Sequence, residues 1–341
     1  MTTVWNRTSA FAALVAFAAV SFGQARTIEV SSPVTGDFLG KSNTVSFNIK
    51  GAKFNVHLVV QAKNNATGQT VSNSKDFQPN GNNEINDSIP LNFSDSATQG
   101  AWTVFVIPHE SDGVHGDFSY NGGVPVKIPV TVDVKSPAFY TINPLNNAYV
   151  KGTGVDQIVH INATLNEPNI DKWTVEVNGG GISNNTGDTP TVNVDWSAKG
   201  IQTDGPQTIV IKVDDKAKNT ASRSVTVNLD RIRPNCRIVT PGPTTVIPPN
   251  TNIPVLIEIK DQFSDSVDVT GVDVVVKSLQ NKFIARVARQ AVNSNGTTLS
   301  WSGRIRSTAK IPNEFKIVVT ALDKAGNVAV VQETRVKIGN R

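Results

Sequence analysis

Two stretches of the chain, about a hundred residues apart, have nearly the same sequence and the same predicted hairpin shape. Each begins with an alternating apolar strand, passes through a polar turn of the pattern Asp-Lys-Ala-x-Asn, and continues into a second alternating strand. The two turns are Asp215–Asn219 and Asp323–Asn327. Because such a hairpin must bury its apolar face against another sheet, its repetition predicts repeated β-domains.

Apolar and polar residues alternate along most of the chain after residue 25, and we find no sustained 3.6-residue apolar period there. Examples are Val56–Val60, Trp102–Ile107 and Ile253–Ile259. Alternation places β-branched and aromatic side chains on one face of a strand, and clusters of Asn and Gly between the strands supply turns. The pattern predicts an all-β fold of packed sheets.

A recurring junction predicts the domain boundaries. A strand closes and the chain enters a proline-marked linker at Val132–Pro137 and again at Leu229–Pro234. The expected units are 26–134, 135–232 and 233–341, each of a common domain size.

Tryptophans at equivalent positions allow the second and third units to be aligned with each other. Trp196 and Trp301 each precede an Asp-Lys-Ala-x-Asn turn by about twenty residues, where a large ring would fill the space between two sheets. The first unit has Trp102 near its end and lacks the turn, with a long loop over 108–123 in its place. We therefore expect the first unit to be the divergent copy.

The first 25 residues have the pattern of an export signal. Arg7 precedes the apolar run Ala10–Phe22, and Gly23–Ala25 supplies small residues where a signal peptidase would cut. The run is too short for a helix that spans a bilayer of about 30 Å, and a retained membrane anchor is the alternative. We expect cleavage after Ala25 and a protein that is secreted to the cell surface or periplasm, with no membrane span in the mature chain.

Composition narrows the possible chemistry further. The single cysteine, Cys236, cannot form an intrachain disulfide, and we expect it to be a small buried apolar residue. The formal net charge is +4, with basic residues scattered among acids, so the sequence predicts no nucleic-acid partner.

The two Asp-Lys-Ala-x-Asn turns and the Asp230–Pro234 junction together resemble the immunoglobulin-like repeats of exported and surface-attached bacterial proteins. The resemblance implies three tandem immunoglobulin-like β-sandwich domains. Such repeats serve in adhesins, in cell-wall and layer proteins, and in extracellular enzymes as spacers. The implied function is a non-enzymatic structural or adhesive scaffold. The alternatives are a module that binds cell-wall polysaccharide or a protein partner, and an accessory part of an extracellular enzyme system.

In some relatives, acids at domain junctions hold calcium that stiffens the chain of domains. The resemblance therefore implies a possible calcium ion, held by acids at the junctions and in the turns. The positions to test are Asp133, Asp215, Asp230 and Asp323.

Two observations weigh against that calcium site. Calcium takes six to eight oxygens, and Arg231 and Arg233 flank Asp230. The alternative is that the turn acids only bond to their own backbone. The acidic stretch Asp261–Asp268 lacks the spacing of a calcium loop and is interpreted as an exposed turn.

The long loop of the first unit concentrates histidines and carboxylates. Side chains of this kind could bind a transition metal or recognise a partner, and a plain polar surface hairpin is the alternative. His57 and His160 alternate with apolar neighbours and are interpreted as ordinary strand residues. The loop residues are His109, Glu110, Asp112, His115 and Asp117.

No enzyme motif is found. The chain contains no Gly-x-Ser-x-Gly, no phosphate loop and no His-Glu-x-x-His, so we expect no catalytic activity and no cofactor apart from calcium. The expected partner is a protein or a cell-envelope polysaccharide. Self-association through strand edges is also possible, with Thr27–Val30 and Val328–Ile338 as the edge elements.

Overall fold

A computed structural model describes residues 25–339, apart from 179, 264–266, 296–297 and 307–310. It divides into two compact units, one ending at Val134 and one beginning at Lys135. Strands dominate both, as the alternating sequence predicts, and the described part has only two short 3-10 turns, at Asn121–Gly123 and Ala198–Gly200. No described helix is long and apolar enough to cross a membrane. All of the predicted export signal except Ala25 lies outside the described residues.

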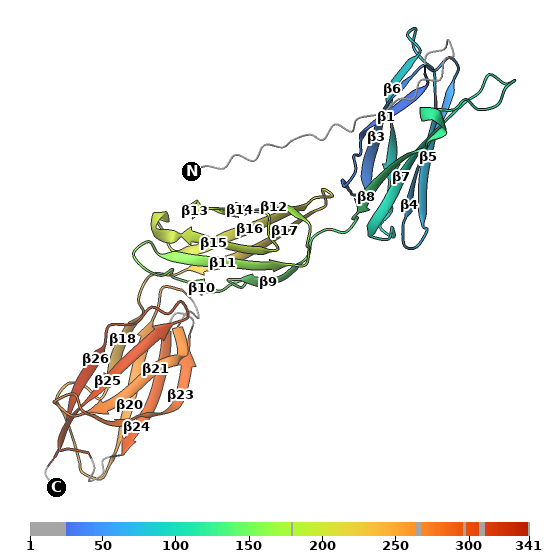
Figure 1. The fold of residues 1–341 in the computed structure, drawn as a ribbon. Coiled ribbons are helices and arrows are strands. Elements are labelled where there is room, and N and C mark those ends of the chain that lie inside the picture. Colours follow the sequence, from blue (N-terminus) through green and yellow to red (C-terminus); the bar gives the residue numbers. More distant parts are fainter. Residues whose placement is uncertain (1–24, 179, 264–266, 296–297, 307–310, 340–341) are drawn as a thin grey trace, which may run out of the picture. The chain divides into compact units, whose positions relative to one another are not determined.

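The first unit is one sandwich of two sheets, antiparallel except where β2 pairs with β8 (Figure 1). Its smaller sheet has the order β1 (Thr27–Ser32), β3 (Ser42–Lys50), β6 (Glu84–Asn92), and its larger sheet the order β2 (Phe38–Leu39), β8 (Val126–Val132), β7 (Gly100–Glu110), β4 (Val56–Asn64), β5 (Thr70–Phe77).

The second unit contains two sandwiches. In the first of these, one sheet has the order β13 (Ile182–Ser183), β15 (Thr191–Ser197), β11 (Ile158–Leu165), β9 (Phe139–Asn143), and the other the order β10 (Tyr149–Val150), β17 (Thr220–Leu229), β16 (Gly205–Asp215), β12 (Ile170–Val177), β14 (Thr186–Gly187).

The last sandwich repeats this plan. One sheet has the order β18 (Asn235–Thr240), β20 (Asn252–Lys260), β24 (Thr298–Arg306), β23 (Ala288–Ser294), and the other the order β19 (Thr245–Ile247), β26 (Gln332–Ile338), β25 (Glu314–Asp323), β21 (Val267–Lys277), β22 (Phe283–Arg286).

All three sandwiches share one topology apart from their edge strands. The first strand pairs with the third in the smaller sheet, and a short second strand crosses over to pair in parallel with the last strand of the larger sheet. A cis X-Pro bond precedes each crossover strand, at Ser32–Pro33, Asn143–Pro144 and Thr240–Pro241. In immunoglobulin lettering, the third sandwich has strands A (β18), B (β20), E (β24) and D (β23) in one sheet and A′ (β19), G (β26), F (β25), C (β21) and C′ (β22) in the other. The other two have the same order apart from their edge strands, so all three are immunoglobulin-like sandwiches. The first one lacks a counterpart of β13 and β23 in its smaller sheet.

Each sandwich has an apolar core of its own, with a tryptophan in it. Trp196 and Trp301 are buried on the inner face of their sheets, as the sequence predicts. Trp102 packs edge-to-face on Phe93 at 5.2 Å between ring centres and donates its indole N–H to the Thr98 carbonyl at 2.7 Å. Cys236 is buried in the third core, again as predicted.

The two repeated turns have the same hydrogen bonds. In one, the backbone N–H and side-chain amide of Asn219 donate to the two carboxylate oxygens of Asp215, at 2.9 and 2.8 Å. In the other, Asn327 donates to Asp323 in the same way, at 2.7 and 2.8 Å. The turn needs one residue with positive φ, which is Gly326 (82°) in the second copy. This local chemistry explains why the Asp and Asn recur.

The edge strands differ in part from expectation. Thr27–Val30 lies in β1, which is an edge of its sheet. The last strand begins at Gln332 instead of Val328, and β19 covers its final residues in parallel register. Residues 328–331 form an irregular segment before the strand, joined to the sheet by a bridge between Val328 and Leu322.

The buried tryptophans yield a prediction. Trp196→Ala should destabilise the second sandwich by about 3–5 kcal/mol, because the lost ring leaves a cavity in a closed core. Calorimetric melting of the protein would show a lower transition for that domain. Tyr140→Ala, at a surface position, is the control and should leave the melting curve unchanged. Equal effects of the two changes would contradict the assigned core.

Candidate functional site

Three carboxylates meet in the second unit, where three strands end. Asp230 directly follows β17, Asp261 directly follows β20, and Asp323 is the last residue of β25. One carboxylate oxygen from each lies within 4.8 Å of the other two. Asp230 and Asp323 are buried, and Asp261 is half-buried. The strand ends of two successive sandwiches therefore bring together acids that are far apart in the sequence.

Asp230 is the innermost acid of the cluster. Its side chain is 0% exposed, and its Oδ1 accepts hydrogen bonds from the Gln262 amide at 2.8 Å and from the Ile232 N–H at 3.3 Å. Its Oδ2 is buried without a hydrogen-bond partner. A buried carboxylate oxygen left without a donor is costly unless a cation or a proton compensates it.

The Asp-Lys-Ala-Gly-Asn turn builds one wall of the cluster. Asn327 binds Asp323 through its side-chain amide, and the same amide donates to the Asp230 carbonyl at 2.9 Å. The turn that closes the hairpin of the third sandwich is thus bonded directly to the junction residue. This double use of Asn327 ties the position of Asp230 to that of Asp323.

Burial disfavours negative charge at this site. Desolvation, with a smaller contribution from the neighbouring charges of Asp261 and Asp323, raises the pKa of Asp230 to about 6. Burial also raises the pKa of Asp323. Buried acids with raised pKa values mark a site that favours a cation or a proton.

The arginine beside Asp230 does not occupy the cluster. The Arg231 guanidinium forms an ion pair with Asp204 at 2.6 Å and donates to the carbonyls of Ala198 and Ile201. These contacts hold Arg231 against the second sandwich, which answers the sequence-based objection to a cation for Arg231, whereas Arg233 lines a hollow together with Asn327.

The donor set fits calcium. All three side chains offer oxygen, the ligand that calcium prefers, and one of those oxygens is a buried atom without a donor. Asp230 and Asp323 were candidates from the sequence, whereas Asp261 was interpreted as part of an exposed turn. Nothing in the local spacing around Asp261 reveals its partners. Its one signal is its place directly after a strand, at the same end as the Asp323 turn.

The other two sequence candidates lie elsewhere. Asp215 holds the equivalent turn of the second sandwich, and one of its carboxylate oxygens lies within 4.8 Å of one from the buried Glu167. Glu167 also accepts a hydrogen bond from the Asn169 N–H at 2.7 Å. Asp133, in the first unit, is buried and accepts a hydrogen bond from Gln99 at 2.5 Å.

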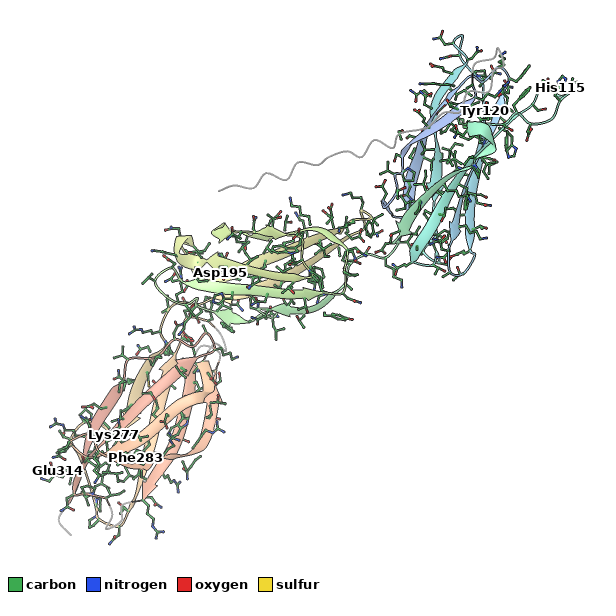
Figure 2. All side chains as sticks on the ribbon, viewed as in Figure 1. His115, Tyr120, Asp195, Lys277, Phe283 and Glu314 are labelled. Carbon is green, nitrogen blue, oxygen red and sulfur yellow. The ribbon has the colours of Figure 1, made fainter. Side chains whose placement is uncertain are left out.

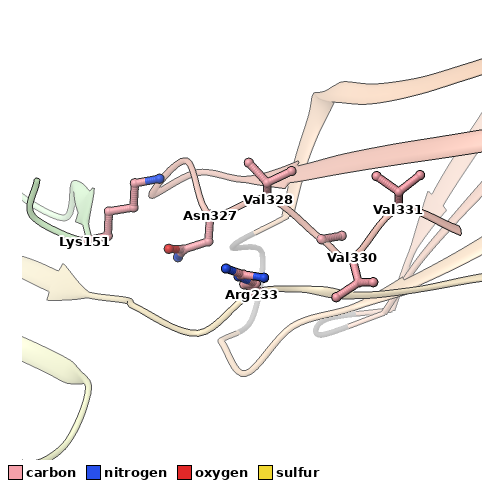
Figure 3. A pocket seen from close by; sticks show the side chains of 7 residues that line it. Lys151, Arg233, Asn327, Val328, Val330 and Val331 are labelled. Atoms are coloured by element: carbon pink, nitrogen blue, oxygen red, sulfur yellow. The ribbon is translucent and has the colours of Figure 1, made fainter. Parts of the chain in front are cut away.

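A shallow hollow of about 630 Å³ adjoins the acid cluster (Figure 3). Lys151 reaches across to it and donates a hydrogen bond to the carbonyl of Gly326. Three exposed valines of the irregular segment give the hollow an apolar side. Its lining residues are Lys151, Arg233 and Asn327–Val331.

In the first unit, Glu110 is not available to an outside ligand. Its carboxylate is fully buried and accepts hydrogen bonds from Arg26 (2.7 Å), Tyr120 (2.6 Å) and the backbone N–H groups of Lys53 and Phe54. Burial alone would raise the pKa of Glu110, but these donors outweigh it and the pKa lies below its usual range. Glu110 therefore serves as a structural anchor of this domain.

The remaining four loop residues form two separate pairs. His115 bonds to Asp112 at 2.6 Å near the tip of the loop, and His109 bonds to Asp117 at 2.7 Å near its base. Figure 2 shows His115 out on the projecting loop, away from the body of the sandwich, and Tyr120 at the sandwich itself. The structure thus divides the five predicted residues into an anchor, a tip pair and a base pair.

Comparison with known proteins extends to the fold alone. No model of a known protein family matches the sequence, and no curated protein matches it. Among solved structures, fibronectin(III)-like modules of Clostridium thermocellum CbhA are 14% identical over 59% of this chain and 93% of theirs, with a TM-score of 0.38. A calcium-stabilized adhesin with which an Antarctic bacterium binds ice is 18% identical over 94% of this chain and 76% of the adhesin chain, with a TM-score of 0.31. Immunoglobulin domains 1–5 of Sidekick-1 are 10% identical over 94% of this chain and 60% of theirs, with a TM-score of 0.32.

The raised pKa of Asp230 yields a pH prediction. Between about pH 4 and 6 the folded protein retains a proton that the unfolded chain releases, so the contribution of Asp230 to stability falls as pH rises through that window. In chelator at pH 7.5, Asp230→Asn should raise the melting temperature of the third sandwich by roughly 4 °C or more, the shift that about 1 kcal/mol produces. Calorimetry measures it.

The control for this change is Asp214→Asn, an exposed acid of the neighbouring domain, which should shift no transition. The increase in melting temperature that Asp230→Asn produces should also become smaller as the pH is lowered toward 4. An increase that stays constant between pH 7.5 and 4 would show that titration of Asp230 is not its cause.

Proposed function

We propose that this chain is an exported, non-enzymatic structural or adhesive protein of the cell surface. The observation that carries the proposal is the threefold use of one immunoglobulin-like sandwich, each copy with its own closed core. Among the described residues, the acid cluster and the histidine–aspartate pairs lie at strand ends, on outer sheet faces and on one loop. Such an arrangement suits a protein that spans distance and makes contacts at its ends.

The arrangement of the histidines supports a non-enzymatic role. The chain has four, and each bonds to an aspartate: His57 to Asp76, His109 to Asp117, His115 to Asp112 and His160 to Asp195. The one cysteine is buried, and burial raises the pKa of its thiol to about 11. Among the described residues, neither group forms the nucleophile–base pair of a covalent hydrolase.

The strand pairing suits a protein under tension. In the second sandwich, β10 near the start of the domain pairs in parallel with β17 at its end. A force that separates the two ends of the domain would pull parallel partners in opposite directions, so their hydrogen bonds are strained together instead of one after another. The same pairing joins β2 to β8 and β19 to β26.

Calcium at the acid cluster would add stiffness to this framework. Asp230, Asp261 and Asp323 would hold the ion, and its charge would compensate the buried Oδ2 of Asp230. Because these acids come from the linker and from the C-terminal ends of two strands in the third sandwich, a bound ion would fix the linker against that domain.

The calcium proposal predicts a shift in melting. A millimolar excess of Ca²⁺ over chelated protein should raise the transition of the third sandwich at pH 7.5, since a ligand that binds only the folded state stabilises it. Asp230→Asn should abolish the shift and Asp214→Asn should retain it. Identical calorimetric curves with Ca²⁺ and with chelator would contradict a structural ion at this cluster.

The projecting loop of the first unit favours a second function, recognition of a cell-envelope polysaccharide or a protein. Val114 and His115 are largely exposed near its tip, beyond the bridge between Ser111 and Asp117 that closes its base. An apolar and an aromatic side chain therefore lie together on a protruding loop, where a partner can reach both.

A double change tests the loop. Val114→Ser with His115→Ser should reduce binding to isolated cell-wall material at least about tenfold in a pull-down, because it removes the exposed apolar and ring contacts. Deletion of the whole loop is unsuitable, since Glu110 and Tyr120 anchor the domain. Val155→Ser, on an exposed loop of the second sandwich, is the control. Unchanged binding by the double variant would remove the loop from this role.

A further inference from the structure

A row of four side chains crosses the outer face of the larger sheet in the first unit. His57 on β4 lies opposite Asp76 on β5 and, on its other side, opposite His109 on β7. Asp117, from the loop after β7, bonds to His109. The row thus reads acid, histidine, histidine, acid. The sequence separates its members by up to sixty residues, and only the strand register brings them together.

Each of the two histidines forms a hydrogen bond with an aspartate of its own. Nδ1 of His57 donates to Asp76 at 2.7 Å, and Nδ1 of His109 donates to Asp117 at 2.7 Å. An ionised carboxylate only accepts hydrogen bonds, so the proton of each neutral ring sits on Nδ1 and the lone pair on Nε2. A carboxylate that holds one ring nitrogen is the usual means by which proteins orient a histidine toward a metal ion.

We propose that His57 and His109 together bind one divalent transition-metal ion, such as Zn²⁺, Ni²⁺ or Cu²⁺, through their Nε2 atoms. Residues directly opposite on adjacent antiparallel strands have Cβ atoms about 4.5–5.5 Å apart, a span that one ion bridges. The ring centres lie 6.5 Å apart. Binding would require the two side chains to rotate until both nitrogens lie at the usual distance of about 2.0–2.1 Å from zinc.

Exposure leaves room for that rotation and for further ligands. The side chains of His57 and His109 are 49% and 44% exposed, and neither belongs to the core. Two ring nitrogens fill half of a tetrahedral shell, so the other two positions face solvent. Imidazole nitrogen favours zinc, nickel and copper over calcium and magnesium, which separates this site chemically from the acid cluster.

The chain contains its own comparisons for this site. His160 on β11 bonds to Asp195 on β15 at 2.6 Å, which repeats the acid–histidine pair without a second histidine. His115 bonds to Asp112 on the projecting loop. Each of these provides one oriented nitrogen, whereas His57 and His109 provide two at adjacent positions. Chelation by two rings therefore distinguishes the proposed site from the isolated pairs.

Titration calorimetry with ZnCl₂ tests the proposal, using the full chain after purification and removal of metal. We expect one Zn²⁺ per chain. His57→Gln and His109→Gln should each weaken binding about tenfold or more, and His160→Gln should change it less than about twofold. Asp76→Asn should weaken binding about tenfold, the effect of removing the acid that orients a metal-bound histidine.

Three outcomes would overturn the proposal. One is the absence of saturable Zn²⁺ binding to the unaltered chain at millimolar metal. Another is a loss of binding in His115→Gln or His160→Gln equal to that in His57→Gln. The third is displacement of Zn²⁺ by excess Ca²⁺, which would place the ion at the acid cluster. All substituted side chains are exposed, and unchanged melting curves would show that each variant is folded.

Discussion

Each sandwich of this protein depends on the closure of its own apolar core, because the chain has one cysteine and no disulfide to stabilise a domain. The inner faces of the strands are therefore almost purely apolar, with a tryptophan in each core. Apart from a few buried exceptions such as Thr334, polar side chains lie at strand ends, on outer faces and on loops. Both candidate metal sites follow from this distribution, since one lies where three strands end and the other lies on an outer sheet face.

The acid cluster lowers the stability of the folded protein, because it buries a carboxylate that lacks a full set of hydrogen-bond donors. Asp230 is buried with one oxygen lacking a donor, and its pKa is raised as a result. An asparagine at this position would avoid the charge at no cost in size. A buried acid beside two others is more readily understood as a place for a cation than as a device for folding. By contrast, Glu110 is equally buried, but its donors satisfy it and lower its pKa, which marks an anchor.

The two proposed sites differ in chemistry and in the freedom of their ligands. The junction offers only oxygen, is mostly buried, and suits a hard cation that stiffens a linker. The cross-strand histidines offer nitrogen, are half-exposed, and suit a borderline metal with open coordination positions. An ion at the first site would act within the chain. An ion at the second would remain accessible to ligands from solvent.

Local pattern in the sequence was sufficient to predict the all-β class, the repeated hairpins, the buried tryptophans and the buried cysteine, because alternation and turn chemistry act over a few residues. The resemblance to immunoglobulin-like repeats, and not this local pattern, pointed to Asp230 and Asp323 as calcium candidates, whereas the stretch that begins at Asp261 was interpreted as an exposed turn and His57 as an ordinary strand residue. Tertiary structure decided which acids meet and which histidines face each other. Those contacts depend on strand register and sheet order between distant segments, which no short window of sequence contains.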